Sequence, residues 1–445
     1  MSRIWKSWRA PGVALLALAT ATGAAAQDGT AVASTPPVGE ELSLADVYEL
    51  ARARNPMLRA SSAMADAAET REASAGLPPD PTLQVGVMNF SVPGFETDMP
   101  TSMVPSVQAM QMLPFPGKLG LSQRIAEQST SMARAGAAET WWEVRSMAAT
   151  AFFNIYEIDQ KLAVMRETLG LLQDFQQVAQ AMYSSGTGRQ SDVLRANVEV
   201  ARMDAEIQKM VAMRKVAAAR LNAVLDRPAE TPVPGAELPS MPSGSRDQET
   251  LRSWAEETRP MLLRSKTGVE QAQTREDLAR KQIWPNFNLG IQYGQRDAGA
   301  MGTERMGSAM VGFSIPVFAK SRQLRQRDEA AAMEAMAQAE LTNVRAQVDA
   351  RIGELLAELE RVQTLVDLYS DEVLPQADAN VESSFSSYRV GDVDFMTLVD
   401  AQMTANRYEQ EFYTLLADYG RAMAHLEMTV GRELQTDTET TAEAP

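Results

Sequence analysis

Two hydrophobic periods alternate along the chain. In the segment 286–293, "NFNLGIQY", apolar residues at every second position predict a strand with one apolar face. The same alternation recurs in the segments 82–90, 107–113 and 308–317. Loops that contain glycine, methionine and proline join the strands of each pair. We therefore predict two β-hairpins, at about residues 82–113 and 286–317.

After each hairpin the pattern changes to the helical period. No proline occurs from Gly117 to Arg227, and in the second half Pro375 alone stands between Pro316 and the C-terminal tail. Apolar residues recur there at intervals of three or four, which indicates helices with one narrow apolar stripe. In the second half this stripe consists of Leu341, Val344, Val348, Ile352, Leu355, Leu359, Val362, Val366, Tyr369 and Val373. Helices of about 60 residues would be about 90 Å long, so we expect them to pair lengthwise as in a coiled coil.

Two short glycine-containing segments interrupt these helical stretches. They are "YSSGTGR", residues 183–189, and "YRVGD", residues 388–392. Glycine allows a chain to reverse within a few residues because it adopts positive φ without steric cost. We interpret both segments as the turns of helical hairpins.

A sharp corner separates the two periods. In "QMLPFPGKLG", Pro114, Pro116 and Gly117 are placed to end a strand and begin a helix, and Pro316 marks the same point in the second half. Strands of about nine to eleven residues with an apolar face suit a bilayer, where only closed barrels leave no unpaired edge. Since about eight strands is the smallest barrel, four strands predict that several chains contribute to one.

The chain contains an internal duplication. Asn55-Pro56 has its counterpart in Arg259-Pro260, 204 positions later, and "RLNAVLDR" from Arg220 aligns with "HLEMTVGR" from His425. Repeats of this kind indicate two copies of one structural unit. The predicted division is a signal peptide at 1–26, an N-terminal extension at 27–42, a first repeat at 43–228, a proline-rich linker at 229–246, a second repeat at 247–432 and a disordered tail at 433–445.

The N-terminus has the pattern of a secretory signal. Arg3, Lys6 and Arg9 precede the apolar run 13–19, and the small residues 24–26 suit cleavage before Gln27. No later segment approaches eighteen consecutive apolar residues, so we expect the mature chain to have no transmembrane helix.

Composition excludes several functional classes. With no cysteine and a single histidine, His425, the chain lacks the ligands of common zinc sites and the thiols of thiol enzymes. A net charge of −16 disfavours nucleic acid. The segment "SGTGRQS" lacks the Gly-Lys-Ser/Thr of a phosphate-binding loop. We expect no enzymatic activity, no catalytic or metal-binding residues and no cofactor.

Taken together, these features resemble the TolC-like outer-membrane efflux proteins. The resemblance covers nearly the whole mature chain, through the duplicated unit, the corners "LPFPGKL" and "SIPVF", the segments "YSSGTG" and "YRVGDVDFMTLVDAQ", and "HLEMTVG". It implies a mainly α fold with a β-barrel, in which a homotrimer forms a twelve-stranded barrel that continues into a periplasmic tunnel of coiled helical hairpins. The implied function is a passive exit duct in the outer membrane of a Gram-negative bacterium, in contact with its lipid.

The same resemblance implies partners and sites. The partners are a periplasmic adaptor (membrane fusion protein) and an inner-membrane RND-type pump. A pore gate is implied at Asp400, with Asp394 a looser candidate, although Val393 stands where some relatives carry a basic residue. The alternative for both is a solvated helix face. The predicted adaptor-docking residues are Gly186, Thr187, Gly188, Arg389, Val390 and Gly391.

Cargo and membrane contacts are the remaining predictions. "LPFPGKL" looks most like the heavy-metal (CusC-like) branch, which exports copper or silver ions, and thioethers of the 26 methionines suit such ions. Methionine also serves as adaptable packing. Multidrug efflux, a stand-alone porin and a periplasmic coiled-coil scaffold are the alternatives. Interfacial aromatic girdles or core packing would explain Phe90, Phe115, Trp284 and Phe318.

Overall fold

The structure is a computed structural model, which describes residues 41–89, 92–93, 103–239, 247–297 and 302–434. The predicted signal peptide, nearly all of the N-terminal extension, and Phe90 lie outside the described residues. Two residues of the predicted tail, 433 and 434, are described: Leu434 is buried, and its N–H donates to Glu427 Oε1 at 2.9 Å. The rest of that tail lies outside the described residues. None of the helices in these ranges combines the length and the hydrophobicity that crossing a bilayer requires.

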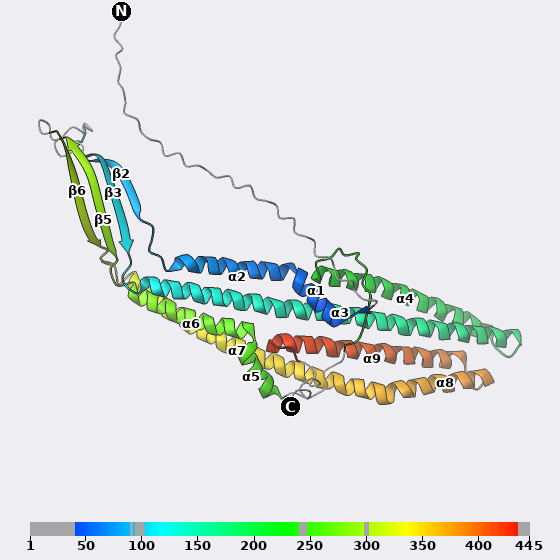
Figure 1. The fold of residues 1–445 in the computed structure, drawn as a ribbon. Helices are drawn as coiled ribbons and strands as arrows, with labels where there is room; N and C mark the ends of the chain where they lie inside the picture. Colours follow the sequence, from blue (N-terminus) through cyan, green and yellow to red (C-terminus); the bar gives the residue numbers. More distant parts are fainter. Residues whose placement is uncertain (1–40, 90–91, 94–102, 240–246, 298–301, 435–445) are drawn as a thin grey trace, which may run out of the picture. The chain divides into compact units, whose positions relative to one another are not determined.

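The elements follow one another in the same order twice (Figure 1). Each time, two short helices lead into a pair of strands, and long helices follow. The first series is α1 (Leu44–Arg54), α2 (Pro56–Ala75), β2 (Thr82–Met88), β3 (Met103–Leu113), α3 (Lys118–Ser184) and α4 (Gln190–Val224). The second series is α5 (Gln248–Thr258), α6 (Pro260–Lys281), β5 (Phe287–Asp297), β6 (Thr303–Phe313), α7 (Gln323–Leu368), the π-helix η2 (Tyr369–Val373), α8 (Leu374–Val390) and α9 (Phe395–Val430).

The four long strands form one antiparallel sheet in the order β2-β3-β5-β6. The two hairpins are thus joined through β3 and β5, where Ala109 lies opposite Ile291. Among the described strands, β2 and β6 are the edges of this sheet. The alternation predicted for 308–317 is correct up to Phe313, but Ile315 and Val317 lie beyond the strand, because the chain turns at Pro316.

The long helices pack against one another along their sides. α3 has 67 residues and is therefore about 100 Å long. It contacts α4 and α9, and nearer the sheet it contacts α2 and α6 (Figure 1). One hydrophobic core joins α5, α6, α7 and α9 and contains most of the predicted stripe, from Val344 to Val362. A second core joins α3, α4, α8 and α9 around Phe175, Tyr388 and Phe395.

Helices α7 and α8 are continuous through the π-helical turn η2. Pro375 lies at the start of α8, directly after this turn. Proline has no N–H to donate, and its ring collides with the carbonyl four residues earlier in a regular helix. A wider turn accommodates that collision, so the single proline alters the helix locally without ending it.

The proline-rich linker is held against the helices in its described part. A short strand, β4 (Gly235–Ala236), pairs in parallel with β1 (Glu41–Leu42). Asn222 Nδ2 donates to Thr231 O at 2.8 Å, and Arg214 Nη2 donates to Val233 O at 3.2 Å. The segment turns where Thr231 N donates to Pro228 O at 3.0 Å, and the bonds to Asn222 and Arg214 attach it to α4.

Candidate functional site

The sheet has two chemically different faces. Residues directly opposite in an antiparallel ladder share a face, so the register assigns every described strand residue to one side. One face is mainly apolar, although Gln111, Gln295 and Arg305 share it. On this face Leu83 and Ile291 are each 68% exposed. Its members include Leu83, Val85, Val107, Ala109, Leu113, Phe287, Leu289, Ile291, Tyr293, Ala309, Val311 and Phe313. An exposed apolar surface of this kind requires lipid or a partner against it.

The opposite face carries amides, hydroxyls, glycines and thioethers, together with the ion pair of Arg296 and Glu304. Its members include Gln84, Ser106, Gln108, Met110, Met112, Asn288, Gly290, Gln292, Met306, Ser308 and Met310. Met88 belongs to it as well, because Gln292 Nε2 donates to the Met88 sulfur. We call this surface the polar face.

Where the strands meet the helices, aromatic rings stack beside a buried lysine. Phe115 stacks on Trp284 with ring centroids 5.1 Å apart. Lys118, at the first position of α3, donates to Trp284 O at 2.8 Å and to Asn286 Oδ1 at 2.9 Å. Phe318 is exposed in the turn before α7. The sequence reasoning missed Lys118, although "PGKL" places it at the start of the helix.

The turn between α3 and α4 depends on two glycines. Gly186 has φ +76°, which favours glycine. A side chain at Gly188 would come within 2.8 Å of Met182 Cβ and 2.9 Å of Tyr183 N. Met182 O accepts from the N–H groups of Thr187 and Gly188, at 2.9 and 2.8 Å. The predicted docking residues of this turn are therefore held in a fixed conformation.

The turn between α8 and α9 is closed by hydrogen bonds from Gly391 N to Tyr388 O and from Asp392 N to Ser387 O, both 3.0 Å. Gly391 has φ +83°, and a side chain there would meet no atom within 4 Å among the described residues. Val390 is 73% exposed, and the Arg389 guanidinium lies over the Phe385 ring at 5.9 Å.

The two predicted gate carboxylates have different surroundings. Asp394 is the N-cap of α9 and accepts from Thr397 N at 2.9 Å and Thr397 Oγ1 at 2.7 Å, and these hydrogen bonds lower its pKa. Asp400 is exposed and forms no hydrogen bond or ion pair within the described ranges. It lies on a stripe of exposed residues along α9, with Thr397, Arg407 and Glu411.

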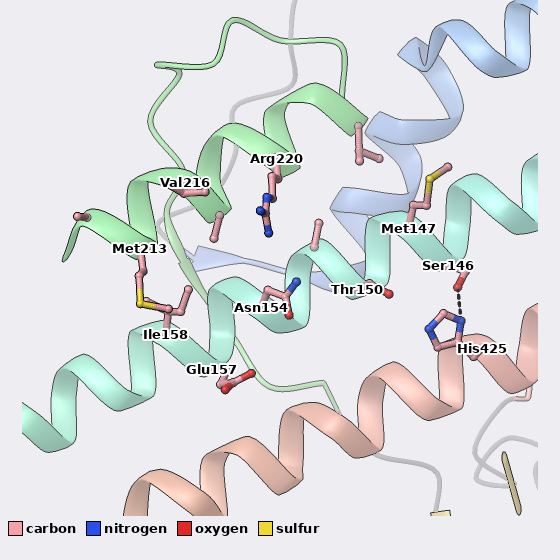
Figure 2. A pocket seen from close by; sticks show the side chains of 14 residues that line it. Ser146, Met147, Thr150, Asn154, Glu157, Ile158, Met213, Val216, Arg220 and His425 are labelled. Atoms are coloured by element: carbon pink, nitrogen blue, oxygen red, sulfur yellow. Dashed lines mark hydrogen bonds between the residues drawn. The ribbon is translucent and has the colours of Figure 1, made fainter. Parts of the chain in front are cut away.

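A groove of about 880 Å³ lies between α3, α4 and α9 (Figure 2). Met213 and Ile158 face each other at one end, and Arg220 points into the groove. At the other end, His425 Nδ1 lies 3.0 Å from Ser146 Oγ. Burial lowers the pKa of the His425 imidazole, and the charge of Arg351 lowers it further.

The carboxylate at this groove already has cationic partners. Burial pushes the pKa of Glu157 upward, but the hydrogen bond and charge of Lys161 and the charge of Arg421 outweigh burial and leave the pKa lowered. Lys161 Nζ lies 2.6 Å and Arg421 Nη1 3.0 Å from its oxygens. Arg421 also donates to Asn154 Oδ1 at 2.8 Å. These contacts give Glu157 a role in joining α3 to α9 rather than in chemistry.

Comparison with known proteins identifies the family. The family model described as outer membrane efflux protein matches residues 47–226 and 251–432. The chain belongs to this family. As an outer membrane efflux protein it is a transport duct and not an enzyme, with its strands in the outer membrane and its helical tunnel in the periplasm. No curated protein is significantly similar in sequence.

Solved structures have the same fold at low sequence identity. CusC superposes with a TM-score of 0.75 at 15% identity, over 87% of this chain and 92% of that one. VceC from Vibrio cholerae gives 0.74 at 15% identity, over 88% and 97%. CmeC from Campylobacter jejuni gives 0.74 at 13% identity, over 87% and 85%. The predicted fold, a helical tunnel with a barrel assembled from three chains, is confirmed at the level of the family.

Proposed function

We propose that this channel is the exit duct of a tripartite system that exports copper or silver ions. Channels of the family are trimeric and work with a periplasmic adaptor and an inner-membrane pump. What supports a metal cargo is the distribution of methionine over the sheet. Met88, Met110, Met112, Met306 and Met310 belong to the polar face. In a barrel the apolar face fits lipid, so these thioethers face the lumen.

A tolerance assay tests the cargo. The gene is expressed, with a metal-type pump and adaptor, in a strain that lacks its own efflux channels. We expect growth at higher copper or silver concentrations than the empty vector allows, and no change in tolerance to organic antibiotics. The reverse pattern would favour the second candidate, an exit duct for small organic molecules.

We propose that Asp400 supplies the charge of the pore gate. Its carboxylate is free to face the axis, whereas that of Asp394 is engaged with Thr397. Three like charges around a narrow axis repel one another and favour cations. In planar bilayers, Asp400→Asn is expected to raise the closed-state current and reduce cation preference. Asp204→Asn, an exposed carboxylate on α4, is the control, and an unchanged current in Asp400→Asn would contradict the assignment.

We propose that the two helical turns dock the adaptor. Both turns expose side chains beyond the packed helices, and their glycines hold them in tight conformations. Because the chain has no cysteine, single cysteines can be introduced cleanly. Thr187→Cys and Arg389→Cys are expected to crosslink to the adaptor in cells, whereas Asp204→Cys is not. Equal crosslinking at all three positions would count against docking at the turns.

A further inference from the structure

Two methionines lean over one glycine on the polar face of the sheet. Met110 of β3, Gly290 of β5 and Met310 of β6 lie directly opposite one another in consecutive ladders. They therefore form one row across three strands, with their side chains on the same side. A row of this kind places a residue without a side chain between two thioethers.

The distances show how fully the methionines occupy that space. A Cβ atom at Gly290 would lie 3.3 Å from Met310 Cε and 3.5 Å from Met110 Cγ. Both side chains thus lean toward the backbone of Gly290 from opposite sides. Glycine weakens a strand interior and often marks a point where another group approaches closely. Here the approaching groups are the two thioether side chains.

A third thioether on the polar face lies outside this row. Met88 is opposite Met103, whereas the ladder partner of Met110 on β2 is Thr82. Met88 and Thr82 are six residues apart on one strand, which is about 20 Å. The Met88 sulfur accepts from Gln292 Nε2 instead, so the row itself holds the thioethers of Met110 and Met310.

Core packing does not account for this placement. Met310 is 41% exposed, so it does not fill a buried gap. Adaptable filler would be expected in a closely packed interior. Thioethers grouped among amides on the polar face instead suit a soft ligand.

We propose that Met110 and Met310 form a binding site for Cu(I) or Ag(I) in each protomer. This inference rests on the proposed metal cargo and names the residues that contact it in the barrel. Soft monovalent ions prefer thioether sulfur. The two ligands are uncharged and carry no proton to displace, so binding is weak and independent of pH around neutrality. Weak binding suits a duct, because an ion must leave a site as readily as it enters.

The site is tested by Ag(I) binding to the purified full-length trimer in detergent. Met110→Leu/Met310→Leu removes both sulfurs at nearly constant volume, and Gly290→Val keeps both sulfurs but pushes the side chains apart. The matched control is Met333→Leu/Met336→Leu, two exposed methionines on α7. We expect about tenfold weaker binding in both test variants and none of that loss in the control. Each variant is first checked for intact trimers.

Two results would overturn the site. One is wild-type affinity in Met110→Leu/Met310→Leu, and the other is an equal loss in the control. Sulfur scattering in the Cu(I) X-ray absorption spectrum, reduced in the double variant, gives a readout independent of affinity. Failure of the site is distinguishable from failure of the cargo proposal. If cells gain metal tolerance but the variants bind Ag(I) as the wild type does, only the proposed site is contradicted. If the purified trimer binds Ag(I) at the site but cells gain no tolerance, only the proposed cargo is contradicted.

Discussion

The two halves of the chain hold the C-terminal ends of their last helices, α4 and α9, with different kinds of contact. In the first half, Asn55 Nδ2 donates to Val224 O at the end of α4, at 2.8 Å. At the corresponding position of the second half, Arg259 Nη1 donates to Thr429 O near the end of α9, at 3.0 Å, and pairs with Glu139 at 3.5 Å. A neutral amide therefore does in one half what a buried ion pair does in the other.

The neighbouring positions differ in the same sense. Asn222 is completely buried and donates to linker carbonyls, whereas its counterpart Glu427 accepts from Arg145 and from Leu434 N. Removing a neutral partner forfeits one hydrogen bond, but removing one ion leaves the other charged and buried. The end of α9 should therefore be more sensitive than the end of α4 to both substitution and pH.

The largest expected effect is that of Arg259→Met. It leaves Glu139 without its cation and Thr429 O without its donor, at a cost of about 3–5 kcal/mol. Asn55→Ala, its counterpart, removes a helix cap and one tertiary hydrogen bond, at a cost of about 1 kcal/mol. Thermal unfolding of purified trimers measures both. Equal costs would show that the ion pair contributes no more than the amide.

Gly431→Ala is expected to cost about 1–3 kcal/mol. Gly431 has φ +74°, and a Cβ there would lie 2.7 Å from Arg259 Cα, so both strain and collision oppose a side chain. The aligned residue Asp226 also has positive φ, 52°, but its side chain is free to pair with Arg59 at 3.1 Å. Unfolding of both variants checks this, and Asp226→Gly is expected to remain within about 0.5 kcal/mol of the wild type.

The two turns extend the comparison to function. Gly188→Ala forces a methyl group against Met182 and the Tyr183 backbone, whereas Gly391→Ala meets open space and strains only φ, by about 1–2 kcal/mol. We expect the first variant to reduce adaptor-dependent efflux more than the second. Efflux of the cargo measured at equal channel abundance decides the order. A stronger effect at Gly391 would indicate that turn rigidity is not what the adaptor requires.

A smaller effect is expected from pH. Burial raises the pKa of Glu139 above its ordinary 4.5, although Arg259 and the Met261 N–H act in the opposite direction. The folded state therefore holds this proton more tightly than the unfolded chain, and the resulting stability is present below pH 4.5 and lost as pH rises through the raised pKa. Glu139→Gln should remove this slope from the melting temperature measured across that range. An unchanged slope would assign it to other groups.

Much of the fold was predictable because each element has its own period. Alternation located the strands, and the three-to-four spacing from Val344 to Val362 located a stripe that is buried as expected. The pairing of β3 with β5 was not predictable, since it joins the two halves and depends on neither pattern alone. The turn after Pro316 was also missed. The helix begins four residues after Pro114 in the first half but seven residues after Pro316 in the second half.

The candidate sites were less predictable. The glycines of the turns and the prolines of the corner could be recognised in the sequence, because few other residues suit the backbone conformations needed there. The structure places them in those turns. The methionine row over Gly290 follows only from the register of three strands, two of them in the second half. Lys118 is buried against Trp284 and Asn286, contacts that lie more than 160 positions away in sequence. Long-range contacts of this kind leave no local pattern.

The strand order carries a consequence for assembly. With β2 at one edge of the sheet and β6 at the other, rotational symmetry can join neighbouring chains only by placing β6 of one beside β2 of the next. Such a head-to-tail interface can keep adding subunits until the curvature of the sheet brings the last chain back to the first. A single subunit has two unpaired edge strands, and only closure of the ring pairs every edge and fixes the number of subunits.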